Sequence, residues 1–257
     1  MRKENYCKED IVEALKTVGI QNEDSIFVHS NIGFFGILKD ASTQKDYYRL
    51  FKEAIFEVIG PKGTLTVPTF SYSFCNNEKF SLKETKGVCG FFSEEVRDDC
   101  AALRSDDANF SIASIGAKAE YYTTNVDSYS FGSNSFWARF LKDKGKVCNF
   151  NFDSGSTFIH YVERELNVSY RYDKPFYGKI INNKEEYDKV FFHYVHDLNK
   201  PEYIADFSKF DQEAKKLGLK KIVNLGKGQI VSITAEHTYN LIKAELETNP
   251  SFLVKGK

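Results

Sequence analysis

Short apolar runs alternate with longer amphipathic segments over the first 165 residues, and this order constrains the fold more than any other feature. Short runs rich in β-branched and aromatic residues are typical of buried strands. They lie at 25–30, 64–70, 110–118 and 147–152. Segments with apolar residues at helical spacing separate or flank them, at 9–18, 44–59, 91–100, 133–142 and 154–167. Strands that alternate with helices predict a layered α/β domain.

The C-terminal third has a different pattern. Alternating polar and apolar residues predict a small antiparallel insertion at about 168–200. Two further helices are expected at 210–219 and 231–249. Because no repeat, low-complexity tract or long linker interrupts the chain, residues 1–257 are expected to form a single domain.

Charge and cysteine content disfavour several classes of protein. Lys plus Arg number 35 and Asp plus Glu number 36, so the net charge of −1 gives no reason to expect a nucleic acid or a membrane as partner. No apolar run approaches the ~20 residues of a transmembrane helix. The five cysteines include no C-x-x-C pair, which favours reduced thiols, a cytoplasmic protein and no metal site.

His160 is the first residue with a chemical signature. Glu163 follows three positions later, and residues at this spacing are neighbours on a helix. A carboxylate beside an imidazole fixes its tautomer, as a general base requires. Hydroxyls of Ser154, Ser156 and Thr157 stand at the expected helix start, where free N–H groups stabilise an oxyanion. On spacing alone, a surface His–Glu pair with ordinary helix capping explains the pattern at least as well.

The strand expected at 25–30 runs into a glycine-containing turn. The end of the strand and the turn together read His29-Ser30-Asn31-Ile32-Gly33-Phe34-Phe35-Gly36. Its two glycines allow a ligand to approach the backbone closely and to meet free N–H groups. The turn lacks the Lys of a P-loop and the glycine spacing of a dinucleotide site, so an ordinary strand-to-helix loop remains the alternative.

Taken together, these segments resemble the aminoglycoside 3-N-acetyltransferase family. The family pattern runs V-H-S-S with a following Gly, G-x-x-G-T-L-x-x-P-T-F, a Ser-Glu-x-x-Arg helix, an Arg-Ser strand entry, F-G-x-x-S-P and T-x-x-H-x-x-E. This chain supplies similar motifs in the same order between about residues 8 and 172. They are Val28-His29-Ser30, the segment from Gly60 to Phe70, Ser93-Glu94 with Arg97, Arg104-Ser105, Phe131-Gly132, and Thr157 with His160 and Glu163.

The resemblance implies a layered α/β/α fold with a mixed sheet. It also implies direct transfer of an acetyl group from acetyl-CoA to a primary amine of an amino sugar, with coenzyme A and no metal. His160 is then the general base, Glu163 orients it, and Thr157 reaches the thioester oxygen or the CoA sulfur. The residues expected to bind CoA are His29, Ser30, Asn31, Gly33, Gly36, Thr69, Ser71, Ser111 and Ala113.

Some positions depart from the family pattern. Asp107 and Ala108 stand where the family has His and Pro, and Asn31 replaces the second Ser of the first turn. Phe136 stands where the family has the Pro of F-G-x-x-S-P. These changes leave the residues expected for CoA binding and proton transfer in place, but they put the acceptor in doubt.

Asp153, Tyr72 and Tyr172 are the residues expected to bind the acceptor. Asp153 is also an alternative acidic partner of His160. Acidic and basic residues are mixed across 168–200, which does not suit a dedicated polycation trap, whereas aromatic side chains there can stack on a sugar or nucleobase. We therefore prefer a nucleotide-linked amino sugar of surface-glycan biosynthesis as acceptor. An antibiotic-modifying resistance enzyme and a non-catalytic CoA- or sugar-binding protein are the alternatives, and a monomer or homodimer is expected.

Overall fold

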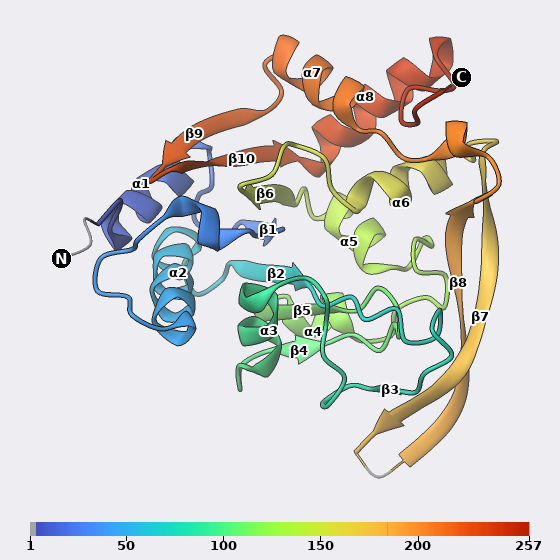
Figure 1. Cartoon of the computed structure of the whole chain (residues 1–257), viewed down its shortest axis with the longest axis horizontal. Coiled ribbons are helices and arrows are strands. Elements are labelled where there is room, and N and C mark those ends of the chain that lie inside the picture. Colours follow the sequence, from blue (N-terminus) through green and yellow to red (C-terminus); the bar gives the residue numbers. More distant parts are fainter. Residues whose placement is uncertain (1–3, 184, 257) are drawn as a thin grey trace.

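A computed structural model describes residues 4–183 and 185–256. Its centre is a seven-stranded mixed sheet with helices on both faces (Figure 1). In spatial order the strands are β4 (Leu103–Arg104), β5 (Ile112–Gly116), β2 (Thr64–Pro68), β1 (Ser25–Phe27), β6 (Lys146–Phe150), β10 (Gly228–Thr234) and β9 (Lys221–Leu225). β1 pairs in parallel with β2 and β6, and the other neighbouring strands are antiparallel.

Two hydrophobic cores form, one on each face of the sheet, because consecutive side chains of a strand point to opposite sides. In β1, Ile26 packs in one core and Phe27 in the other. Helices of the first core are α1 (Lys8–Thr17), α2 (Gln44–Ile59) and α3 (Phe91–Asp98). Helices of the second core are α4 (Ala119–Thr123), α5 (Phe136–Lys142), α6 (Phe158–Glu165), α7 (Ser208–Lys216) and α8 (Ala235–Thr248). The predicted layered α/β/α fold with a mixed sheet is confirmed.

α2 illustrates how the local sequence sets an element's ends. Thr43 Oγ1 accepts the Asp46 N–H at 3.2 Å, and the Asp46 carboxylate accepts the Thr43 N–H at 2.9 Å. This reciprocal capping box satisfies free N–H groups at the helix start. At the other end Gly60 has φ +67°, a conformation that glycine adopts without a side-chain penalty. The helix occupies the predicted residues 44–59.

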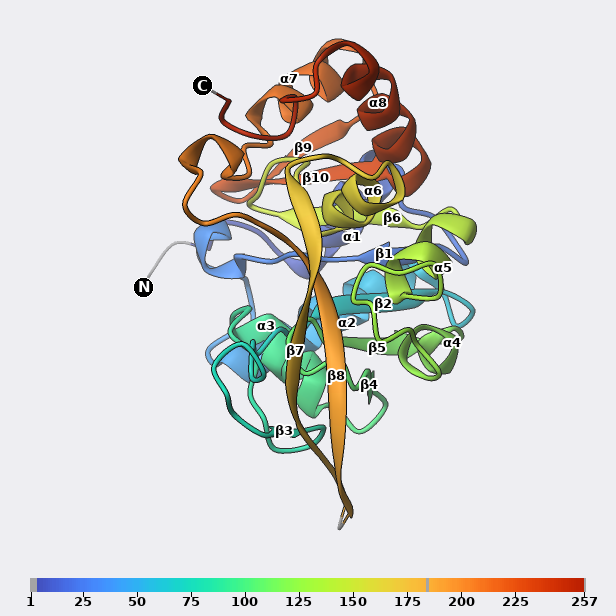
Figure 2. The same cartoon turned by 90° about the vertical axis from the view of Figure 1, so that its right-hand side faces the viewer.

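A long antiparallel hairpin lies within the predicted insertion. It consists of β7 (Arg171–Asn182) and β8 (Glu185–His196), and the short strand β3 (Phe80–Ser81) pairs in parallel with β7. The hairpin runs across one end of the central sheet (Figure 2). Hydrogen bonds between Phe192 and the backbone of Ser128 and Ser130 attach β8 to the loop before α5. The hairpin therefore forms a wall at the end of the sheet near α6.

Two of the predicted helices begin four residues later than expected. Residues 231–234 belong to β10, and the last helix begins at Ala235 after its cap residue Thr234. β-branched residues that run directly into a helix provide no break by which the two elements can be separated. α6 begins at Phe158, so Ser154 and Ser156 precede the helix. No helix among the described residues is both long enough and apolar enough to span a bilayer.

Candidate active site

His160 and Glu163 are in contact on α6. His160 Nδ1 lies 2.6 Å from Glu163 Oε2, and the Glu163 side chain is fully buried, whereas that of His160 is 22% exposed. An imidazole nitrogen that faces a carboxylate carries the proton, so Nδ1–H donates to Glu163 and Nε2 keeps its lone pair. His160 also lines a pocket. It therefore presents a free base nitrogen at a site that a ligand can reach.

Two residues at the entry to β7 complete the surroundings of Glu163. Tyr170 Oη donates to Glu163 Oε1 at 2.9 Å, and Arg171 Nε lies 2.8 Å from Glu163 Oε2. Burial by itself raises the pKa of Glu163, but the contacts with His160, Arg171 and Tyr170 outweigh burial and lower that pKa. Glu163 is therefore an ionised, buried carboxylate whose charge is balanced by Arg171.

The same surroundings keep His160 neutral. Burial lowers the pKa of His160, the Arg171 charge lowers it further, and the hydrogen bond and charge of Glu163 offset part of both effects. The rings of Phe131 and Phe207 flank the imidazole at centroid distances of 5.7 and 5.6 Å. A neutral imidazole held between aromatic rings is ready to accept a proton at neutral pH.

The turn after β1 meets the start of α6. His29 Nε2 accepts the Thr157 N–H at 3.5 Å, and the Asn31 N–H donates to Phe150 O at 2.9 Å. Burial lowers the pKa of His29 to about 4, so its ring is neutral and is free to accept this bond. The turn expected to bind CoA and the helix that carries His160 are therefore adjacent in the fold.

Two buried hydroxyls at this junction, Ser30 Oγ and Ser156 Oγ, have no hydrogen-bond partner within the described part of the chain. A buried hydroxyl without a partner costs about 1–3 kcal/mol, so such atoms normally receive a bond from a ligand or an ordered water. The amide and thioester groups of an acyl-CoA carry donors and acceptors of the matching kind. The residues at this junction therefore fit the acyl donor that the resemblance implies.

The two glycines of the turn have different surroundings. At Gly33 a side chain would meet open space, so the backbone is accessible there. Gly36 has φ +89°, and a Cβ at this position would collide with the Asn5 side chain. Packing against the N-terminal segment accounts for Gly36, whereas Gly33 leaves room for a ligand beside the backbone.

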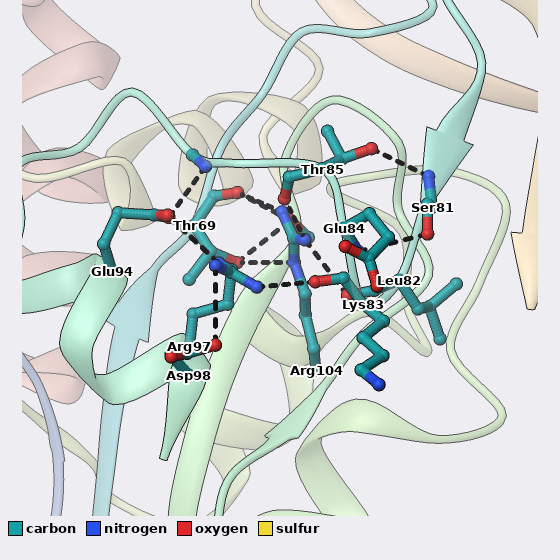
Figure 3. Close-up of polar contacts among 12 residues, drawn as sticks. Thr69, Ser81, Leu82, Lys83, Glu84, Thr85, Glu94, Arg97, Asp98 and Arg104 are labelled. Atoms are coloured by element: carbon teal, nitrogen blue, oxygen red, sulfur yellow. Dashed lines mark hydrogen bonds and ion pairs between the residues drawn. The ribbon is translucent and has the colours of Figure 1, made fainter. Parts of the chain in front are cut away.

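The other residues expected to bind CoA are buried in or near the central sheet. Thr69 Oγ1 and Ser111 Oγ lie 3.0 Å apart and each accepts a hydrogen bond from Arg104 Nε at 3.2 Å (Figure 3). Ser71 Oγ donates to a main-chain carbonyl, and Ala113 is fully buried in the first core. The polar groups among them are satisfied within the protein, and the structure does not bring any of the four to the pocket beside His160.

Arg104 also holds the loop between β2 and α3 (Figure 3). Its guanidinium donates to the carbonyl oxygens of Leu82 and Thr85, and Arg97 Nη1 donates to Lys83 O at 2.7 Å. A guanidinium presents several donors in one rigid plane, so a single side chain fixes several turns of a loop at once. This loop supplies part of the pocket wall next to His160.

The pocket has a volume of about 520 Å³. Tyr72 from the loop after β2 and Tyr172 from the hairpin line it, and both are among the residues expected to bind the acceptor. Asp153 is not among the lining residues. It is exposed and accepts the Gly155 N–H at 2.8 Å. Because His160 contacts Glu163, the structure also pairs the imidazole with Glu163 and not with Asp153.

Arg171 and Tyr170 are the site residues that the sequence patterns do not reveal. They follow α6 after a turn, and no periodicity relates the direction of their side chains to that of Glu163. The one sequence feature that could have indicated Arg171 is its position shortly after a helical His–Glu pair, because such an Arg is a candidate counter-ion for the Glu. Within residues 4–183 and 185–256 no three His, Cys, Asp or Glu side chains are grouped as ligands for a metal ion.

Comparison with known proteins places this geometry in a family. The model of the family described as aminoglycoside 3-N-acetyltransferase matches residues 27–247. Aminoglycoside acetyltransferase AAC(3)-Xa has 18% identity and a TM-score of 0.80, with 93% of this chain and 92% of that chain covered. AAC-IIIb in a binary complex with CoASH has 18% identity, a TM-score of 0.78 and coverages of 94% and 97%. AAC-VIa bound to sisomicin has 19% identity, a TM-score of 0.77 and coverages of 94% and 97%. No curated protein matches the chain in sequence.

Proposed function

Since the chain belongs to the aminoglycoside 3-N-acetyltransferase family and is therefore an acetyltransferase, we propose that it transfers the acetyl group of acetyl-CoA directly to a primary amine of an amino sugar. The observation that carries this proposal is the state of His160. Its Nδ1–H donates to a buried carboxylate, and its Nε2 has no protein partner among the described residues and belongs to a side chain that lines the pocket.

In the proposed reaction the amine nitrogen attacks the thioester carbon while His160 Nε2 accepts a proton from that nitrogen. The imidazolium that forms is stabilised by Glu163, whose carboxylate remains ionised. Collapse of the tetrahedral intermediate breaks the carbon–sulfur bond, and the proton held by His160 passes to the sulfur. The products are the N-acetyl sugar and free CoA. His160 therefore both accepts the proton from the amine and gives it to the sulfur, and it ends the cycle neutral.

The acyl donor is proposed to lie between the turn after β1 and the start of α6. Ser30 Oγ and Ser156 Oγ supply the unpaired hydroxyls there, and Gly33 leaves the backbone accessible. Thr157, whose N–H already contacts His29, stands three residues before His160. One structural neighbour is a complex with CoASH, which supports coenzyme A as the carrier of the acyl group.

The proposed acceptor is a nucleotide-linked amino sugar, and an aminoglycoside is the second candidate. The second candidate is favoured by a neighbour that is bound to sisomicin, whereas the first is favoured by Arg171 and Lys174, which line the pocket. All five cysteines are free thiols, which supports a reducing, cytoplasmic compartment for the reaction.

The decisive experiment compares His160→Gln with the wild type in an assay of thiol release from acetyl-CoA. We expect kcat to fall by about 10²- to 10⁴-fold, the usual effect of losing a general base, with little change in the Kd of CoA. His237→Gln is the matched control, because His237 is exposed on α8 and should leave kcat unchanged. Undiminished kcat in His160→Gln would show that His160 is not the general base. If no amine in the test causes thiol release, a non-catalytic CoA-binding protein is favoured.

A further inference from the structure

The pocket beside His160 carries more positive than negative groups. Arg171 and Lys174 of β7 line it, and Asp197 is the one carboxylate among its lining residues in the described chain. Asp197 Oδ1 already accepts the Asn199 N–H at 3.0 Å. Because buried Glu163 balances the charge of Arg171, Lys174 and Asp197 are the remaining charged lining residues, and an acceptor with several ammonium groups would find no excess of carboxylates around it.

Arg171 has a donor left over. Its side chain is 5% exposed, its Nε faces Glu163, and its Nη1 donates to Tyr194 O at 3.2 Å. Its Nη2 is buried and has no hydrogen-bond partner among the described residues. A buried guanidinium nitrogen without an acceptor is costly, and a ligand oxygen in the pocket that Arg171 lines would satisfy it.

Lys174 adds an accessible charge on the same strand. It is exposed, lines the pocket, and forms no ion pair within the described residues. Its Nζ lies 5.2 Å from the centroid of the Phe176 ring, which also lines the pocket. An ammonium above an aromatic wall suits a ligand that combines a flat or sugar-like ring with an anionic group.

The acidic residues that the sequence places nearby do not restore a negative field. Asp106 forms an ion pair with Lys189 of the hairpin. Asp107 Oδ1 accepts the N–H groups of Asn109 and Phe110 at 3.0 and 2.9 Å. Both carboxylates are therefore engaged within the protein, and neither lines the pocket.

We propose that the pocket recognises an acceptor whose amino sugar carries a phosphate or diphosphate, and that Arg171 Nη2 and Lys174 Nζ are the groups that bind its oxygens. This inference rests on the proposed function, because it assumes that the acceptor amine is delivered to His160. It narrows the substrate class to singly aminated, anionic sugars and excludes polycationic aminoglycosides as the preferred acceptors.

The test compares amino sugars that differ in charge. Thiol release from acetyl-CoA is measured with glucosamine, glucosamine 1-phosphate, the uridine-diphosphate ester of glucosamine, and the polycation sisomicin. We expect kcat/KM to be at least about 10-fold higher for the two phosphorylated sugars than for glucosamine, and this preference to weaken as salt is added. Sisomicin should be the poorest acceptor of the four.

Two lysine variants on β7 locate the effect. Lys174→Met should reduce the preference, measured as kcat/KM for each phosphorylated sugar divided by kcat/KM for glucosamine, by about 5-fold or more. Lys179→Met is the matched control, because Lys179 already pairs with Asp188 and does not line the pocket, so the preference should stay intact. Equal turnover of glucosamine and its phosphates, a preference for sisomicin, or an unchanged preference in Lys174→Met would each overturn the inference.

Failure of the proposed function gives a different result. If none of the four amines causes thiol release from acetyl-CoA, calorimetry of glucosamine 1-phosphate with the CoA-bound protein still shows whether the pocket binds an anionic sugar. Binding that is weakened in Lys174→Met but not in Lys179→Met would uphold the anion site and reject the transferase. Absence of binding would reject the anion site as well.

Discussion

Replacement of Glu163 by Gln removes one charge from the site and almost no volume. In the wild type, Oε2 faces His160 and Arg171 and Oε1 faces Tyr170. The amide oxygen of Gln can take the place of Oε2, and its NH₂ group can donate to the Tyr170 hydroxyl, which also accepts. The tautomer of His160 is therefore preserved, and the variant isolates the contribution of the negative charge.

The expected loss follows from the hydrogen bond that becomes neutral. A hydrogen bond to a charged group contributes about 1.5–3 kcal/mol, and the charge of Glu163 acts most strongly when His160 becomes an imidazolium. At about 1.36 kcal/mol for each factor of ten, kcat should fall by roughly 10- to 150-fold. The fall should be smaller than that in His160→Gln, because the base itself remains.

The pH profile provides the sharper readout for Glu163→Gln. Glu163 raises the pKa of His160 while burial and the charge of Arg171 lower it. Without the carboxylate, that pKa falls further below 6.5, so the acidic limb of kcat/KM should move to lower pH. Thiol release is followed from pH 5 to 8 with a thiol-reactive chromophore. A purely structural role would lower kcat without moving this limb, and an unmoved limb with wild-type kcat would refute the assignment.

Stability must be measured in parallel, because Glu163→Gln leaves the buried Arg171 without a counter-charge. Breaking a buried pair in this way costs about 3–5 kcal/mol. We therefore expect a lower midpoint in urea denaturation, and the kinetics are to be recorded where circular dichroism shows a native spectrum. Tyr170→Phe is the companion variant, since it removes one donor to the carboxylate and leaves every charge in place.

Two further substitutions separate ligand binding from structural support. Ser156→Ala should raise the KM for acetyl-CoA about 5-fold and should not lower the free energy of unfolding, because the hydroxyl has no protein partner to lose. Lower stability with unchanged KM would contradict this. Arg104→Lys should lower the free energy of unfolding by about 2–4 kcal/mol in urea titrations, because one ammonium cannot serve all of its acceptors. Arg49→Lys, at an exposed pair with Glu53, should change it by less than about 0.5 kcal/mol.

The ends of a helix were predictable from the sequence where its apolar pattern is bounded by a capping residue or a glycine. The segment 44–59 has an apolar stripe, a capping box and a terminal glycine, and its predicted ends coincide with those of α2. The junction at Thr234 has no such break, so the strand β10 merges with the helix α8 in any reading by periodicity. The short strands β3 and β4 have two residues each, and their pairing depends on distant partners.

The contact between His160 and Glu163 was predictable for a different reason. Residues three apart on a helix are neighbours whatever the rest of the fold does, so His160 and Glu163 meet as the spacing requires. The second half of the site, Tyr170 and Arg171, is set by a turn and by the placement of a hairpin. Similarly, Thr69 is buried and accepts a hydrogen bond from Arg104, a distant contact that no local pattern determines.

The acceptor illustrates how pairing changes the meaning of a charged residue. Asp106 and Asp107 suggest an acidic entrance when they are counted along the chain, yet one is neutralised by Lys189 and the other caps a turn. Lys174 is one of several scattered lysines in the same count, but it lines the pocket without an ion pair among the described residues. A ligand responds to charges that are still free to interact, not to the sum of all charges nearby. Around His160, Lys174 forms no ion pair among the described residues, and Arg171, whose charge Glu163 balances, keeps an unused donor at Nη2. These two groups support the proposal that the acceptor carries a negative group of its own.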